Sequence, residues 1–189
     1  MLISNSQIDS IDEDAFKGLS HLEQLVLQNC SLAAVPPIHE DAKSNITTLN
    51  LAHNLITHIP DDYFEVMEKL ENVVLDGNYL KQMPMFDLIK DHVLSISLRE
   101  NQLESLDGLC DNIYPKLRYM QMTSNRIKSL DLGRCLSKAW PGLFRVDLSN
   151  NKIVFISDIG RWTRVQPKSL VRVVLKENPF KVRKKIYLW

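Results

Sequence analysis

The 189-residue chain lacks several features that mark common functional classes. It has three cysteines, at positions 30, 110 and 135, too few for a disulfide scaffold, and it has no Cys-x-x-Cys pair for zinc or redox chemistry. No apolar run approaches the length that spans a bilayer, so we expect no membrane span in this chain. The first residues, MLISNSQIDS, have neither the positive charge nor the apolar core of a signal peptide.

Motifs for catalysis and for cofactor binding are also missing from the sequence. There is no Gly-x-Ser-x-Gly, no phosphate-binding P-loop and no Gly-x-Gly-x-x-Gly. The five histidines show no metal-ligand spacing. We therefore expect no catalytic residues, no cofactor and no metal site.

What the sequence does contain is a repeat, which is clearest in the stretch LNLAHNLITHIP at residues 49–60. The residue equivalent to Asn54 recurs at steps of 23 to 27 positions. Apolar residues stand five and three positions before each of these anchors and two positions after it. Neither an amphipathic helix nor a simple hairpin has this spacing. The eight anchors are Ser6, Cys30, Asn54, Asn78, Asn101, Asn125, Asn151 and Asn178.

The pattern LxxLxLxxN/CxL is that of the leucine-rich repeat family, which this chain resembles over nearly its whole length. The resemblance implies an α/β-type solenoid, the leucine-rich repeat horseshoe. Short parallel strands would line its concave face, and irregular, 3-10 or short helical return segments its convex face. We interpret residues 1–180 as an array of about eight repeats. Residues 181–189 are then a basic and aromatic tail, or a truncated or degenerate C-terminal cap.

The recurring asparagine has a physical reason within such a solenoid. Its side-chain amide turns inward after the strand, and once buried it needs hydrogen-bond partners, which the backbone of neighbouring repeats can supply. The sequence therefore predicts a structural ladder along the array, in which Cys30 replaces one amide as a small buried residue. The ladder residues are Cys30, Asn54, Asn78, Asn101, Asn125, Asn151 and Asn178.

The repeat length and the two ends of the chain point to a subclass. Steps of 24 residues, with Phe16 and Phe64 ten places after their anchors, resemble extracellular-type repeats such as Toll ectodomains and Slit-like proteins. The irregular later repeats are similar to insect, mosquito-type immune proteins of the family. The ending ENPFKVRKKIYLW begins like a cysteine-rich cap but has no cysteine, and Met1 already lies inside a repeat. We therefore expect a fragment, a partial gene model, or a chain whose uncapped ends are covered through homo- or hetero-association with a partner.

Two covalent features are expected if the compartment is oxidising. Cys110 and Cys135 stand nine and ten places after successive anchors, within disulfide range if adjacent repeats stack, although two buried free thiols are the alternative. Asn29 and Asn45 each begin an Asn-x-Ser/Thr glycosylation triplet. We expect Asn45, just before a strand, to be the more accessible of the two.

The outward side chains of the strands form the expected binding surface. They are small and polar in the early repeats and become aromatic and cationic in the later ones, and Tyr and Arg are typical of binding hot spots. The alternative is a generic polar sheet with binding elsewhere. The candidate partner-binding residues are Arg118, Tyr119, Gln121, Phe144, Arg145, Asp147, Arg172 and Lys176.

Charge is divided unevenly along the chain. Residues 1–100 carry 6 Lys and Arg against 16 Asp and Glu, whereas residues 101–189 carry 17 against 7, which favours electrostatic steering or end-to-end association.

We expect a non-catalytic module that binds a protein partner, not nucleic acid, through its concave face. The resemblance implies an extracellular protein, secreted or an ectodomain, in innate immunity or cell-surface recognition. The alternative is an intracellular scaffold or regulatory subunit with three reduced thiols.

Overall fold

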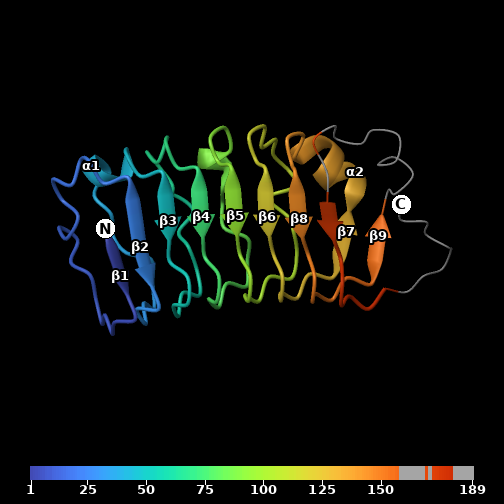
Figure 1. Ribbon diagram of the computed structural model, residues 1–189, viewed down its shortest axis with the longest axis horizontal. Helices are drawn as coiled ribbons and strands as arrows, with labels where there is room; N and C mark the ends of the chain where they lie inside the picture. The colour runs from blue at the N-terminus through green and yellow to red at the C-terminus, as the bar shows by residue number, and fades with distance from the viewer. Residues whose placement is uncertain (158–168, 170–171, 181–189) are drawn as a thin grey trace.

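The computed structural model describes residues 1–157, 169 and 172–180, which form a solenoid of parallel strands (Figure 1). The predicted fold class is thereby confirmed. Eight strands stand side by side in one parallel sheet, in the order β1-β2-β3-β4-β5-β6-β8-β10. Their bounds are β1 (Leu2–Ser4), β2 (Gln24–Gln28), β3 (Thr48–Asn50), β4 (Asn72–Val74), β5 (Ser95–Ser97), β6 (Tyr119–Gln121), β8 (Arg145–Asp147) and β10 (Arg172–Val174). The predicted tail at 181–189 lies outside the described residues.

The strands form where each repeat places two apolar residues with one residue between them. Equivalent positions pair across the sheet, as where Leu49 lies between Leu25 and Val73. From β2 to β8 these inward side chains are fully buried, and burial of one such side chain contributes about 1.5–3 kcal/mol. The residues between them point to the opposite, solvent-facing side of the sheet, which we call the concave face.

The return segments on the other side of the core contain little regular structure. The helical pieces are α1 (Glu40–Lys43), the 3-10 turn η1 (Asp87–Ile89), and α2 (Leu132–Arg134) continuing into the π-helical turn η2 (Cys135–Ala139). A second, two-stranded parallel sheet joins β7 (Ser129–Asp131) to β9 (Phe155–Ser157). Short helical returns were predicted, whereas the β7–β9 sheet was not. Within the described ranges, no helix has the length and apolar character that crossing a membrane requires.

Aromatic side chains fill the space between the sheet and the return segments. Phe16 and Phe64 are buried, as their shared position in the repeat predicted. Phe64 also packs against Phe86, with ring centroids 5.3 Å apart. Trp140 is completely buried, and its indole Nε1–H donates to the Leu109 carbonyl at 3.0 Å, so its polar atom is satisfied.

The asparagine anchors form a continuous ladder of buried hydrogen bonds. At Asn54, Oδ1 accepts from the backbone N–H groups of Cys30 and Leu32 at 3.0 and 3.1 Å. Its Nδ2 donates to the carbonyls of Leu27 and Leu51 at 2.7 and 2.9 Å. Each anchor thus binds backbone groups of its own repeat and of the preceding one. The same arrangement recurs at Asn78, Asn101, Asn125, Asn151 and Asn178.

The residue before every anchor adopts a left-handed backbone conformation. Its φ lies between 51° and 63° in all eight repeats, a conformation that Asn and Gly tolerate better than other residues. Gly77 also lies directly under the His53 imidazole, where a Cβ atom would clash with the ring. The eight residues are Asn5, Asn29, His53, Gly77, Glu100, Ser124, Asn150 and Glu177.

Candidate partner-binding surface

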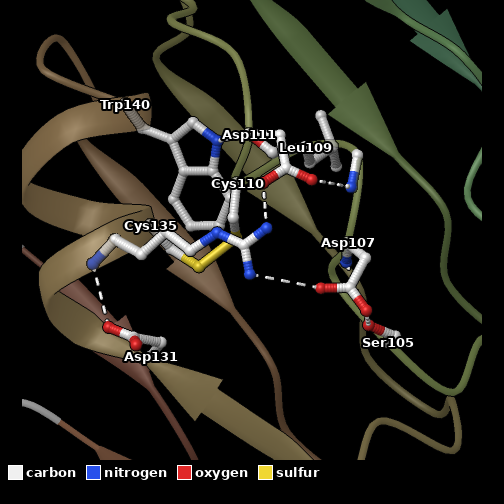
Figure 2. The surroundings of a disulfide bond; sticks show 10 residues. Ser105, Asp107, Leu109, Cys110, Asp111, Asp131, Cys135 and Trp140 are labelled. Carbon is white, nitrogen blue, oxygen red and sulfur yellow. Dashed lines mark hydrogen bonds and ion pairs between the residues drawn. A yellow bond between two sulfur atoms is a disulfide. The ribbon is translucent and has the colours of Figure 1, made fainter.

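A disulfide bond joins the return segments of two successive repeats next to the candidate surface. Cys110 and Cys135 are bonded, with Cα atoms 4.6 Å apart (Figure 2). The Arg134 guanidinium pairs with Asp107 and Asp111, which adds a second, ionic link between the same segments. Cys110 lies in the return segment between β5 and β6, and Cys135 lies in the return segment between β6 and β8.

The third cysteine has a different environment, inside the ladder. Cys30 is a free, buried thiol, and its Sγ donates to the carbonyls of Gln28 at 3.4 Å and Ile3 at 3.6 Å. It therefore occupies the place of an asparagine amide with weaker hydrogen bonds.

Two aromatic rings form the most prominent apolar feature of the candidate surface. Tyr119 begins β6 and Phe144 directly precedes β8. Their ring centroids are 5.8 Å apart with an interplanar angle of 64°, an edge-to-face arrangement. They remain 46% and 42% exposed, although each packs against the other. The structure thus brings these two predicted residues together as one exposed pair.

Arg118 holds the segment before β8 against the segment before β6. Its Nη1 donates to the carbonyls of Pro115 and Gly142, both at 3.1 Å. Its own carbonyl accepts from the backbone N–H groups of Phe144 and Arg145 at 2.8 and 3.0 Å. The guanidinium is therefore committed to backbone groups. Arg118 positions the aromatic pair, whereas the sequence had placed it among the contact residues.

Arg145 is also less available than the sequence indicated. Its Nη2 lies 3.2 Å from Asp147 Oδ2, and both side chains are half-buried on the concave face. Asp147 Oδ1 accepts from the backbone N–H and the hydroxyl of Ser149 at 3.1 and 2.7 Å. Partial burial raises the pKa of Asp147, but the bonds from Ser149 and Arg145 outweigh it and leave that pKa below its usual value. Asp147 is thus ionised at neutral pH and balances the charge of Arg145.

The remaining cations of the candidate set lie on β10 and just after it. Arg172 is exposed and pairs in register with Arg145, and its backbone N–H donates to the Phe144 carbonyl at 3.2 Å. Lys176 is exposed on the same face. Among the described residues, neither side chain has an ion-pair partner. Gln121 lies half-buried between these groups and the earlier repeats, opposite Asp147.

The two glycosylation triplets differ in accessibility in the order opposite to the expected one. Asn29 is exposed, whereas Asn45 is half-buried. The Asn45 amide donates to the Ser20 carbonyl at 2.8 Å and accepts from Lys69 Nζ at 2.6 Å, and the Thr47 hydroxyl of the same triplet donates to the preceding repeat. The expectation that Asn45 is the more accessible residue is therefore wrong. Glycosylation itself stays a prediction.

The parallel sheet, the asparagine ladder and the open sheet face define a leucine-rich repeat protein, and comparison with known families agrees. The family model described as "Leucine Rich Repeat" matches residues 45–67. The chain belongs to the leucine-rich repeat proteins.

Several curated relatives carry the same repeats. The chain is 28% identical to lumican of Rattus norvegicus over 88% of its own length and 48% of lumican. It is 30% identical to keratocan of Gallus gallus over 69% of its length and 36% of keratocan. It is also 29% identical to human leucine-rich repeats and immunoglobulin-like domains protein 1, over 78% of its length and 13% of that protein. These relatives are extracellular or cell-surface proteins, and the chain spans less than half of each.

Solved structures show the same fold at lower identity. The Leptospira interrogans leucine-rich repeat protein LIC12759 aligns with a TM-score of 0.73 at 19% identity, over 97% of this chain and 44% of that one. The leucine-rich repeat domain of APL1B aligns with a TM-score of 0.70 at 21% identity, over 94% of this chain and 56% of that one. At these identities the likeness concerns the fold alone.

Proposed function

We propose that this chain is a non-catalytic, extracellular binding module that recognises a protein partner through its concave face, around Tyr119 and Phe144. The observation that carries the proposal is the aromatic pair itself. Two large rings stay nearly half exposed on an open sheet face, in an orientation fixed by Arg118. Preorganised aromatic groups bind a partner with little loss of conformational entropy.

The extracellular assignment rests on two independent supports. The Cys110–Cys135 disulfide is stable in oxidising compartments and rare in reducing ones. The curated relatives, including lumican and keratocan, are extracellular. A role in innate immunity remains a hypothesis from the sequence resemblance, because the likeness to APL1B concerns the fold alone.

A binding screen with matched variants tests the proposed function. The chain, fused to a dimerising tag for avidity, is screened against arrays of secreted proteins and cell-surface ectodomains. The double variant Tyr119→Ser/Phe144→Ser should lower the affinity for a genuine partner by at least about tenfold, as expected for hot-spot residues. Tyr79→Ser is the control, since Tyr79 is 47% exposed but does not lie on a strand of the sheet.

The outcomes of the screen separate the alternatives. A partner that the double variant loses and the control retains supports binding through the concave face. Partners that bind the double variant and the wild type with equal affinity would place the binding site elsewhere and refute the proposal.

A further inference from the structure

Most exposed carboxylates lie away from the sheet, whereas cations lie both on the return segments and on the concave face. In the first three repeats most of the exposed carboxylates lie on the return segments, away from the sheet, whereas Glu23 and Glu71 directly precede β2 and β4. Few carboxylates point from the sheet itself. The exposed acidic residues of these return segments include Asp12, Glu13, Asp14, Asp61, Asp62 and Glu65.

The carboxylates that do lie on the concave face are already engaged. Asp76 Oδ1 accepts from the Ser97 hydroxyl at 2.6 Å and from the Arg99 backbone N–H at 2.8 Å. Asp147 is bound by Ser149 and Arg145. Asp76 and Asp147 are therefore each held by hydrogen bonds from neighbouring residues of the sheet.

The cations on this face are in the opposite condition. Arg99, Arg172 and Lys176 are exposed, and no ion pair to any of them is found among the described residues; Arg172 and Lys176 are the two on the side of the aromatic pair. Arg172 also lies close to the aromatic pair, because its backbone N–H donates to the Phe144 carbonyl. The aromatic pair and Arg172 thus lie next to one another across β6, β8 and β10, and Lys176 lies on the same face beyond the C-terminal end of β10.

We infer that the partner binds this face with an acidic segment that also carries an apolar or aromatic side chain. The carboxylates pair with Arg172 and Lys176, and the apolar side chain packs on Tyr119 and Phe144. Arg145 stays paired with Asp147 and does not form an ion pair with the partner. This inference rests on the proposed function and adds the chemistry of the partner.

A protein segment fits this surface better than a polyanion such as nucleic acid. Polyanions are held by many phosphate contacts distributed along a cationic track. Here one of the two arginines at the start of β8 and β10 is neutralised internally, and Arg118 is bound to carbonyl groups. Arg172 beside the aromatic pair, with Lys176 farther along the same face, matches one or two carboxylates near an apolar anchor, which is the composition of a protein interface.

A displayed library of random peptides, selected against the folded chain at physiological salt, tests the inference. We expect enriched peptides to combine Asp or Glu with an aromatic or large aliphatic residue. Their affinity should fall by about tenfold or more with Arg172→Glu/Lys176→Glu. Lys152→Glu is the matched charge reversal, because Lys152 is exposed outside the strands, and it should leave affinity within about twofold.

The remaining outcomes contradict one proposal or both. Enriched peptides that are neutral or basic, yet are lost with Tyr119→Ser, would overturn the acidic partner and leave the concave binding face intact. Peptides insensitive to both sets of variants would refute the binding face as well. If selection on the wild-type chain enriches no peptide beyond what the Arg172→Glu/Lys176→Glu chain enriches, the inference is overturned. It is also overturned if a single-stranded oligonucleotide binds the chain more tightly than every enriched peptide.

Discussion

The replacement of one ladder asparagine, Asn78→Leu, is the sharpest test of what holds the repeats together. The Asn78 side chain is 4% exposed. Its Oδ1 accepts from the Ile56 N–H at 3.0 Å, and its Nδ2 donates to the carbonyls of Leu51 and Leu75 at 3.0 and 3.1 Å. Leucine has the same γ-branched shape as asparagine but a larger volume, so the change removes the hydrogen bonds and adds some overpacking in the core.

The cost follows from what each partner keeps after the substitution. The Leu51 carbonyl still accepts from Asn54, and the Leu75 carbonyl still accepts from Asn101. The Ile56 N–H loses its acceptor inside the core, and one such orphaned donor costs about 1–3 kcal/mol. With the two weakened carbonyls, the free energy of unfolding should fall by about 2–4 kcal/mol.

Urea denaturation, monitored by far-ultraviolet circular dichroism, measures this decrease in the free energy of unfolding. Asn72→Leu is the control, since Asn72 is half-buried on the concave face and its side chain makes one long contact, 3.5 Å, to Thr48. It should change stability by no more than about 0.5 kcal/mol. Equal losses for the two variants, or a loss below about 1 kcal/mol at Asn78, would refute the ladder as a source of stability.

Three further predictions concern the surface and its covalent chemistry. Gly142→Ala should displace the Arg118 guanidinium, because its Cβ would clash with that group and lie 2.6 Å from the Pro115 carbonyl; we expect about 1–3 kcal/mol of destabilisation in thermal melts and loss of binding at the aromatic pair. Reduction of the disulfide should lower stability by about 2–4 kcal/mol, measured by melting with and without reductant, and an unchanged melting temperature would contradict a structural role. In secretory expression, intact mass with and without glycosidase should show sugar lost with Asn29→Gln and retained with Asn45→Gln; the reverse result would mean that accessibility in the folded state does not decide usage.

Much of the fold was predictable because the spacing of the apolar and asparagine positions in each repeat determines where the strands and the ladder form. The apolar pairs around Leu49 and Leu51, the buried Phe64 and the anchor at Asn54 each follow from one periodic pattern. The left-handed residue before each anchor was missed. Its signal was present, since Asn or Gly fills that position in half of the repeats.

The outward orientation of the candidate residues was predictable, but their contacts were less so, and their role in binding stays a prediction. Alternation along the strands placed Tyr119 and Arg145 outward correctly. The sequence could not show that Arg145 is balanced by Asp147, nor that Arg118 is bound to backbone carbonyls, because both depend on side-chain conformation. The β7–β9 sheet and the helical turns at 132–139 depend on contacts between return segments of differing length, which the repeat pattern does not encode.

The ladder gives the array a direction. Every ladder asparagine accepts from a backbone N–H of the preceding repeat, so each repeat is completed by the one that follows it. Removing a repeat from the C-terminal side, such as the one with Asn178, strips the acceptor from the Ile153 N–H of the repeat left behind. Removing the first repeat takes the Met1 carbonyl from the Val26 N–H and the Ile3 carbonyl from the Cys30 thiol, but it takes no ladder asparagine from a backbone N–H, because Asn54 still serves Leu32. Shortened forms of this solenoid should therefore tolerate trimming from their N-terminal end better than from their C-terminal end.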